Sequence, residues 1–400
     1  MAIERLALGD PHEVAAQVRS LAPGAESVTK AVAAIVADVR ERGDAALVEY
    51  VRRFDGGEGP LRVEPGGDLD PDVRAGLEVA VENVRAVAAA GLVDERAVIL
   101  PEGHSVTLRE VPVRRAAIYV PGGRAPYPST VVMGVVTARV AGVEEVVVCA
   151  PRAHPLILAT CAMCGADEVY SMGGAHAVAA LAYGTETVHR ADVIAGPGNL
   201  YVQEAKRLVS GDVGIDGFAG PSDVLVLASA GADPRLVGID LAAQAEHGEG
   251  TIVCAASDDP ALLDAIAFDP GDAAAALVDA PDLEAAIAFA EAFAPEHLEL
   301  VGADAEALAP RVRRAGCLFV AREGATAFGD YVAGSNHTLP TGGAARFASG
   351  LHVGHFRRRM SEVRIGGAAG ALAAAGAPIA RAEGFERHAA SMEVRENPAP

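Results

Sequence analysis

The chain has no tryptophan, and aromatic residues make up only 4% of its 400 residues. Its hydrophobic content of 51% therefore comes mainly from Ala, Val and Leu, which suits alanine-rich helices packed on valine-rich strands. A hydrophobic fraction this high excludes a disordered chain. A length of 400 residues exceeds what one core usually supports, so we expect at least two domains, each with its own core.

Positive charge is also scarce. The formal net charge is -21 and the sequence pI is about 4.9. Lys30 and Lys206 are the only lysines, so arginine supplies nearly all of the positive charge. A net-acidic surface without a basic stripe repels phosphate backbones, and we therefore expect no nucleic-acid partner.

Long apolar runs and a disulfide framework are missing. The most membrane-like stretch, residues 365–380, consists mostly of Gly and Ala and is too short to span a bilayer. The first ten residues carry charges where a signal peptide needs an apolar core, and the five cysteines are scattered. We expect a soluble, cytoplasmic protein that does not interact with a membrane. Cys161 and Cys164 have CxxC spacing, but no second pair exists, so we interpret them as core residues.

Strand-like and helix-like segments alternate along most of the chain. The first series begins with the β-type run 116–120, and the second extends from 223–229 to 317–321. Between 251–257 and 297–301 the sequence predicts one long alanine-rich helical stretch. The strand-like runs are apolar on both faces, which is typical of parallel sheets covered by helices. The pattern predicts an α/β protein with two Rossmann-like, doubly wound parallel sheets and a helical C-terminal segment.

Three glycine-rich junctions follow strands of the first series, at 120–129, 172–177 and 195–202. Glycines at such places let backbone amides approach a phosphate, and ligands bind beyond the carboxyl ends of parallel strands. None of the three is a G-x-G-x-x-G fingerprint, and each alone is more typical of an ordinary tight turn. Together on one sheet they indicate a nucleotide site.

Gln244 and His247 lie three residues apart on a predicted helix and project from the same face. An amide oxygen beside an imidazole nitrogen can hold a divalent metal, although a helix-end cap is the commoner role for such a pair. Further potential ligands, Asp330, His337 and His388, follow downstream. His352 and His355 are interpreted as surface or packing residues.

Eight strings occur in the following order along the chain: PGGRAPYPSTVVMG, GGAHAVAALAYGT, GPGNLYVQEAK, IDGFAGPSD, DLAAQAEHG, FAPEHLEL, GDYVAGSNHTLPTGGAARFASGL and EGFERHAASMEVR. In these strings and their order the sequence resembles the histidinol dehydrogenase family. The resemblance implies a zinc- and NAD-dependent enzyme that oxidises L-histidinol to L-histidine through L-histidinaldehyde, the last step of histidine biosynthesis. It also implies one zinc ion per subunit and a homodimer with shared active sites.

The resemblance assigns proton transfer to the adjacent residues Glu296 and His297. An imidazole suits the removal of the hydroxyl proton during hydride transfer, because its pKa is near neutral. A carboxylate in an apolar pocket suits the second oxidation, in which water adds to the aldehyde, because burial raises its pKa. Without the flanking motifs, the pair would be read as a surface acid and base at a helix-to-strand junction.

The resemblance also implies three residue sets. The zinc ligands are Gln244, His247, Asp330 and His388. The substrate-binding residues are Ser222, Gln244, His247, Glu296, His297, Asp330, His337, Glu383 and His388. The residues that bind NAD are Tyr119, His176 and Asn199.

His176 departs from the family pattern, because the family usually has glutamine at this position. Both side chains donate and accept hydrogen bonds, so we expect NAD binding to persist with altered strength or pH dependence. The Gly- and Ala-rich C-terminal stretch is also looser than the family pattern. Family enzymes are homodimers whose C-terminal segment crosses to the partner, so Glu383 and His388 are candidates to complete the other subunit's site.

The combined prediction divides the chain into four parts. These are an N-terminal segment at 1–20, a discontinuous α/β domain at 21–115 and 223–350 with most catalytic and metal residues, an NAD-binding α/β domain at 116–222, and a C-terminal helical segment at 351–400. Two alternatives stay open at this stage. One is a related zinc- and NAD-dependent dehydrogenase that acts on another small alcohol, and the other is a zinc hydrolase or metal-binding α/β protein without NAD.

Overall fold

The computed structural model describes residues 3–22, 28–58, 61–122, 125–217 and 220–395. The chain forms two compact units, which are described separately. The first contains Met1–Gly91 and Val113–Phe356, and the second contains Leu92–Pro112 and Arg357–Pro400. Two six-stranded sheets, here called sheets A and B, lie in the first unit, and a three-stranded sheet C lies in the second.

Sheet A has the strand order β1-β12-β11-β10-β13-β14, and all of its strands are parallel. The central strand is β10. From it the chain proceeds through β11 to β12 on one side, and later adds β13 and β14 on the other side, as in a doubly wound fold. The strands of sheet A are β1 (Ile3–Ala7), β10 (Asp223–Ala228), β11 (Ile252–Ser257), β12 (Ala274–Asp279), β13 (His297–Val301) and β14 (Cys317–Val320).

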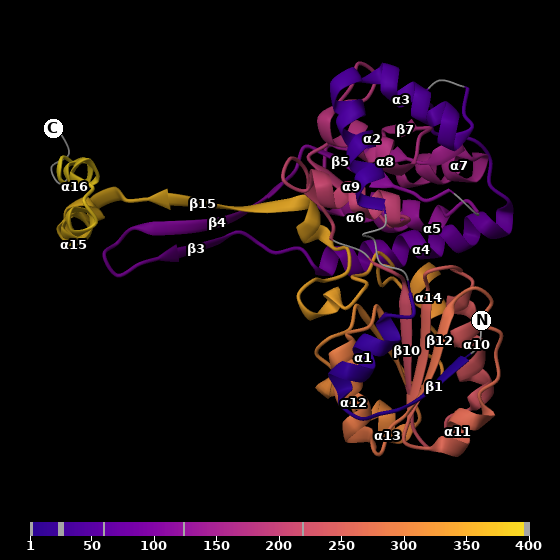
Figure 1. Ribbon diagram of the computed structural model, residues 1–400. Helices are drawn as coiled ribbons and strands as arrows, with labels where there is room; N and C mark the ends of the chain where they lie inside the picture. The colour runs from indigo at the N-terminus through magenta and orange to yellow at the C-terminus, as the bar shows by residue number, and fades with distance from the viewer. Residues whose placement is uncertain (1–2, 23–27, 59–60, 123–124, 218–219, 396–400) are drawn as a thin grey trace. The chain divides into compact units, whose positions relative to one another are not determined.

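Helices cover both faces of sheet A (Figure 1). One face packs against α1 (Pro11–Arg19), α12 (Leu283–Phe293) and α13 (Ala303–Glu306). The other packs against α10 (Pro234–Ala245) and α11 (Pro260–Ala265), and α14 (Thr326–Tyr331) contacts α10. Asp233 caps α10 by accepting a hydrogen bond from the amide of Arg235, and Pro234 occupies the first turn, as the sequence predicts.

Sheet B has the order β2-β7-β6-β5-β8-β9, with only β2 antiparallel among its described strands. Its strands are β2 (Arg62–Val63), β5 (Arg115–Tyr119), β6 (Glu145–Cys149), β7 (Glu168–Tyr170), β8 (Val193–Ala195) and β9 (Gly214–Ile215). Five strands repeat the order of sheet A, with β5 in the central role of β10. The predicted α/β class with two doubly wound sheets is therefore confirmed.

Both faces of sheet B are also covered. One core contains residues of α2 (Thr29–Arg42), α3 (Asp44–Tyr50), α8 (Gly174–Tyr183) and α9 (Leu200–Val209). The opposite core contains residues of α7 (Pro155–Cys164) and of a continuous helical run made of α5 (Pro128–Val131), a π-helical turn (Val132–Val136) and α6 (Thr137–Val140). The helix α4 (Pro71–Ala90) packs against this run. Cys161 is buried in the same core, and both Cys161 and Cys164 are free thiols.

The packing of the early helices differs from their assignment by sequence. Val32, Val39 and Leu47 share a core with Ala117 and Val147 of sheet B, whereas we had grouped residues 21–115 with 223–350. Likewise, β1 from the predicted N-terminal segment pairs with β12. An amphipathic helix shows which of its faces is buried but carries no signal for which of two similar sheets it covers. The complete domain division stays a prediction.

The long helical stretch predicted between 251–257 and 297–301 was wrong in its middle. Residues 274–279 form β12, a fully paired strand between β1 and β11. Alanine favours helices, so AAALVD reads locally as helical, but small side chains also suit a strand that helices cover on both faces. Tertiary packing outweighs the local preference here.

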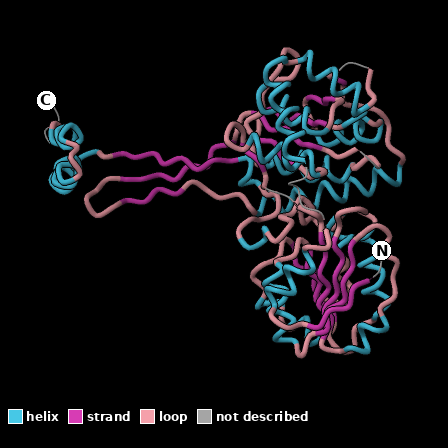
Figure 2. The backbone as a smooth tube through the Cα atoms, in the orientation of Figure 1, coloured by secondary structure: helices cyan, strands magenta, loops and turns pink. Residues whose placement is uncertain are grey.

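The second unit is an antiparallel sheet followed by two helices (Figure 2). Sheet C has the order β15-β4-β3. Its elements are β3 (Arg96–Ile99), β4 (Ser105–Pro112), β15 (Arg357–Arg364), α15 (Ala369–Ala382) and α16 (Glu386–Glu393). The C-terminal segment predicted as helical thus contains an eight-residue strand, β15. Within the described ranges, no helix combines the length and apolar character that crossing a membrane would require.

Candidate active site

The predicted acid–base pair lies where two neighbouring strands of sheet A begin. His297 is the first residue of β13, Asp223 is the first residue of β10, and the two strands are paired. Glu296 precedes His297 in the short connection from α12. The pair therefore lies at the amino ends of the strands, whereas the glycine-rich turns of sheet B follow the carboxyl ends of its strands. Of these two groups of residues, only the second lies at the carboxyl ends of strands, where ligands of parallel sheets usually bind.

The Glu296 carboxyl is buried and held by two donors. Its Oε2 accepts hydrogen bonds from Ser222 Oγ at 2.6 Å and from the amide of Asp223 at 3.0 Å. Burial raises the pKa of Glu296 to about 7, with His297 opposing the rise and Asp223 adding to it. A carboxyl with this pKa can take up and release a proton near neutral pH, as a general base must.

The His297 imidazole is oriented through its Nδ1 atom, which lies 3.2 Å from the carbonyl oxygen of Asp223. Because a carbonyl only accepts, Nδ1 carries the hydrogen and Nε2 is left to react. Nε2 lies 3.6 Å from Asp330 Oδ1. Burial alone would lower the pKa of His297, but the charges of Glu296 and Asp330 outweigh it and raise the pKa to about 9.

Asp330 lies on α14 and faces His297. Burial alone would raise the pKa of Asp330. His297 outweighs this effect, with smaller contributions from His337 and His247, and the pKa of Asp330 lies below its usual value. The carboxylate therefore carries a negative charge toward a cluster of imidazoles.

His337 follows α14 and is tied at both ring nitrogens. Its Nδ1 lies 3.0 Å from the carbonyl oxygen of Asp330, and its Nε2 lies 3.2 Å from Thr130 Oγ1 on α5. Burial lowers the pKa of His337, so the neutral ring is favoured. The predicted substrate residue thus joins the Asp330 segment to the helical run beside sheet B.

The Gln244 and His247 side chains suit metal coordination. Gln244 Nε2 donates to Ser222 Oγ at 2.7 Å, while its buried Oε1 has no hydrogen-bond partner within the described part of the chain. His247 Nδ1 lies 3.0 Å from the carbonyl oxygen of Gln244, a contact that orients the imidazole ring. A buried amide oxygen without a hydrogen-bond partner in the described part of the chain, an imidazole and the Asp330 carboxylate are donor types that zinc accepts.

The described residues of one chain do not supply a full set of conventional ligands. No three His, Cys, Asp or Glu side chains among them lie close enough together to hold a metal. The fourth predicted ligand, His388, lies on α16 in the second unit, and the predicted substrate residue Glu383 directly follows α15 there as its C-cap. Their place in the site stays a prediction.

The predicted cofactor residues lie around the carboxyl ends of sheet B. Tyr119 ends β5, and its hydroxyl accepts a hydrogen bond from the amide of Gly174 at 2.9 Å. His176, in the first turn of α8, is buried, and its Nε2 lies 3.0 Å from Asp55 Oδ2. The same Asp55 oxygen accepts the amide of Gly173 at 2.9 Å. The carboxylate of Asp55, which lies at the end of the helical segment after α3, therefore fixes the turn before α8.

The turn after β8 is fixed in a similar way. The amide of Gly196 donates to Asp216 Oδ2 at 2.7 Å, and the ammonium of Lys206 bonds both to Asp216 and to the Gly196 carbonyl. Gly196 has a φ of 126° and packs against Tyr119, so a side chain would collide with the backbone there. Asn199 caps α9 by accepting from the amides of Tyr201 and Val202.

Sequence reasoning did not single out Asp223, Asp55 or the Lys206–Asp216 pair. Asp223 is fully buried, accepts the Glu296 amide at 2.7 Å and pairs with Arg19 at 3.0 Å. The sequence feature that could have indicated Asp223 is its position as a charged residue at the start of the apolar run DVLVLA. Buried charges need such partners, and the partners lie far away in sequence.

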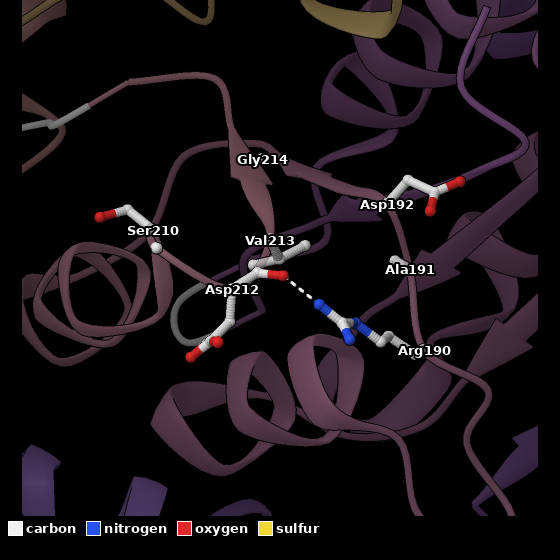
Figure 3. A pocket seen from close by; sticks show the side chains of 8 residues that line it. Arg190, Ala191, Asp192, Ser210, Asp212, Val213 and Gly214 are labelled. Atoms are coloured by element: carbon white, nitrogen blue, oxygen red, sulfur yellow. Dashed lines mark hydrogen bonds between the residues drawn. The ribbon is translucent and has the colours of Figure 1, made fainter. Parts of the chain in front are cut away.

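A pocket of about 350 Å³ lies apart from these residues, beside the amino ends of β8 and β9 (Figure 3). Arg190 reaches across it to the backbone carbonyl of Asp212. The pocket contains none of the predicted site residues; its lining comprises Arg190, Ala191, Asp192, Ser210, Gly211, Asp212, Val213 and Gly214.

Comparison with known proteins identifies the family of the chain. A model of the histidinol dehydrogenase family matches residues 20–396. The histidinol dehydrogenase of Thermus thermophilus is 44% identical over 400 residues, which cover 92% of this chain and 95% of the relative. The enzyme of Rhizobium meliloti is 41% identical, with 93% of each chain covered. The crystal structure of histidinol dehydrogenase from Elizabethkingia anophelis superposes with a TM-score of 0.89 at 28% identity and covers 98% of both chains. The chain belongs to the histidinol dehydrogenase family.

Proposed function

We propose that this NAD-dependent oxidoreductase converts L-histidinol to L-histidine in two successive oxidations at the Glu296–His297 site. Family membership supports the reaction class. The observation that carries the proposal is the buried acid–base pair at the start of β13, with each member in a different electrostatic setting. Two proton-transfer groups at one site suit a reaction with two oxidations, because each oxidation removes a hydride and a proton.

In the first oxidation, His297 takes the proton of the substrate hydroxyl through Nε2 while the neighbouring carbon gives up a hydride. NAD supplies the hydride acceptor when it is bound. His297 can accept a proton only in its neutral form, and a cation near Asp330 favours that form by offsetting the carboxylate. The hydrogen bond from Nδ1 to the Asp223 carbonyl keeps the ring oriented.

In the second oxidation, Glu296 serves as the base that removes a proton from water as it adds to the aldehyde. Ser222 and the Asp223 amide hold the carboxylate oxygen in place, so its lone pairs have a defined direction. Burial places its pKa close to the working pH. These different settings support the proposed division of labour between the two residues.

We assign one zinc ion per subunit to Gln244, His247, Asp330 and His388. When bound, zinc supplies a positive charge and a fixed anchor for the nitrogen atoms of the substrate. The partnerless Oε1 atom of Gln244 supports this assignment. Ser222, His337 and Glu383 complete the substrate site, and orientation of this kind can lower a barrier by about 7 kcal/mol.

The NAD site is assigned to the carboxyl ends of sheet B, around Tyr119, His176 and Asn199. We also propose a cytoplasmic homodimer built through the second unit. That unit exposes several large apolar side chains, including Ile99 at 79%, Ile379 at 61% and Phe385 at 53%, while its own described core is limited to a few alanines. Such exposed apolar side chains are typical of a surface that a partner covers. In the dimer, Glu383 and His388 would serve the neighbouring site.

The decisive experiment measures NADH formed per L-histidinol consumed. Two per substrate identify the four-electron reaction, and one per substrate would contradict it. A panel of other small alcohols tests whether a different substrate is preferred. NAD should also raise the melting temperature, because a ligand that binds only the folded state stabilises it. Absence of that shift would favour a zinc protein without NAD.

A further inference from the structure

Glu299 is a buried carboxyl that neither proton transfer nor the assigned metal site uses. It lies on β13 between Leu298 and Leu300 and is 1% exposed. Successive side chains of a strand point to opposite faces, so Glu299 and His297 face the same side of sheet A. A carboxyl in this position needs a specific partner, because burial without one is costly.

The partner of Glu299 is the first residue of α14. Glu299 Oε1 accepts the amide hydrogen of Thr326 at 3.0 Å. The residue before the helix, Ala325, provides no side-chain cap. Glu299 thus performs from a neighbouring strand what a capping residue normally does within the chain.

The far end of α14 faces the acid–base pair. Asp330 lies four residues after Thr326, on the same side of the helix, and its Oδ1 is 3.6 Å from His297 Nε2. The strand β13 therefore contacts both ends of α14, with Glu299 at the start and His297 opposite Asp330. Gly329 fits closely against the ring of Phe319, where a side chain would collide at 2.5 Å.

The helix α10, which carries the assigned ligand Gln244, packs against α14. Burial raises the pKa of Glu299, and the charge of Asp240 on α10 raises it further. Asp240 precedes Gln244 by four residues, so both lie on one face of α10. The direct contact of Glu299, however, is with α14.

We propose that Glu299 is a positioning residue that fixes α14 against β13 and thereby sets Asp330 opposite His297. Its catalytic consequence rests on the proposed function, but the contact itself does not. Glu299 belongs to none of the residue sets assigned to substrate, metal or proton transfer.

The most direct test removes the amide hydrogen of Thr326, which Glu299 accepts. Thr326→Pro deletes the amide hydrogen at a first helical position, where proline is well tolerated, and the preceding residue is already extended at φ -63° and ψ 138°. Thr326→Val keeps the amide hydrogen and the side-chain volume, so it is the matched control. A second pair is Glu299→Leu, which removes the acceptor, and Glu299→Gln, whose amide oxygen can still accept.

Two readouts apply to all four variants. Hydrogen exchange of residues 327–332 should accelerate about tenfold in Thr326→Pro and Glu299→Leu, since a buried acceptor or donor loses its partner. The kcat for L-histidinol should fall about tenfold in the same two variants, with KM for NAD unchanged because the cofactor residues lie on sheet B. Thr326→Val and Glu299→Gln should stay within about threefold of the parent in both.

The positioning role would be overturned if Thr326→Pro behaved like Thr326→Val, or if Glu299→Leu behaved like Glu299→Gln. The exchange measurement does not require activity. If L-histidinol is not oxidised at all, the proposed function fails, while the role of Glu299 in holding α14 is still decided by hydrogen exchange.

Discussion

Ser222 donates its hydroxyl hydrogen to Glu296 Oε2 at 2.6 Å and accepts the side-chain amide of Gln244 at 2.7 Å. One hydroxyl thus links the carboxyl assigned to the second oxidation with a residue assigned to the metal. Ser222 is itself assigned to the substrate, so the serine connects three functions through two hydrogen bonds. This connection makes it a useful place to test the site.

Replacing Ser222 with Ala should raise the pKa of Glu296 further, because the hydrogen bond from Ser222 lowers that pKa. Aldehyde oxidation requires the charged carboxylate, so its rate should rise with pH around a midpoint that lies above the parent's. The measurement is kcat for L-histidinaldehyde against pH. Ser229→Ala is the control, since Ser229 follows the opposite end of β10, where its hydroxyl accepts the amide hydrogen of Ala305. A midpoint that stays unchanged in Ser222→Ala would contradict the assignment.

The buried Glu296 carboxyl should also make stability depend on pH. Its folded-state pKa is about 7 and its ordinary value is 4.5, so the folded state binds the proton more tightly than the unfolded state. The contribution of Glu296 is therefore fully present below pH 4.5 and is lost as pH rises toward 7. Glu296→Gln should raise the free energy of unfolding at pH 8 relative to the parent by about 1–3 kcal/mol, and much less at pH near 4.5. Urea unfolding at both pH values measures this, and a variant that is less stable at pH 8 would refute it.

His297→Asn should lower kcat for L-histidinol by about 10²–10⁴-fold, the usual range for loss of a general base. Asparagine can still donate to the Asp223 carbonyl but cannot accept the substrate proton. Zinc content, measured on the purified variant, should match that of the parent. Loss of the metal together with activity would mean that His297 has a ligand role instead.

The Asp55–His176 contact should support NAD binding through the turn before α8. His176→Ala and Asp55→Ala each release that turn, and each should raise KM for NAD about tenfold, while the double variant should be no worse than the single variants. His176→Gln keeps a donor toward Asp55 and should lie close to the parent. Steady-state kinetics with varied NAD decides the matter. Fully additive effects would show that the two residues act independently.

His388→Ala should lower zinc affinity at least tenfold if α16 supplies the fourth ligand. The measurement is zinc retained after dialysis against a chelator of known affinity. His355→Ala is the matched control, because His355 packs against His352 with ring centroids 4.4 Å apart and is not an assigned ligand. Unchanged zinc retention in His388→Ala would remove His388 from the metal site.

Mixing inactive Glu296→Gln and His388→Ala subunits should restore part of the activity only if each site takes residues from both subunits.

The sequence by itself determined the α/β class and most strand and helix positions, and it indicated Glu296 and His297 as the candidate acid–base pair. Those features are local: apolar runs of strand length, caps such as Asp233, and short motifs such as APEHLE. Prediction from local sequence was wrong at β12, where the alanines favour a helix but the segment forms a strand that pairs with neighbours on both sides. A pattern of one segment cannot say what its neighbours will be.

Tertiary structure alone decided which distant residues meet. Asp55 reaches His176 and Lys206 holds Gly196 because buried charges find partners wherever the chain brings them. The placement of Glu296 and His297 at the amino ends of β10 and β13 likewise follows from strand order. Burial raises the pKa of Glu296. Burial alone would lower the pKa of His297, but Glu296 and Asp330 raise it, and Asp330 lies more than 30 residues away in the sequence.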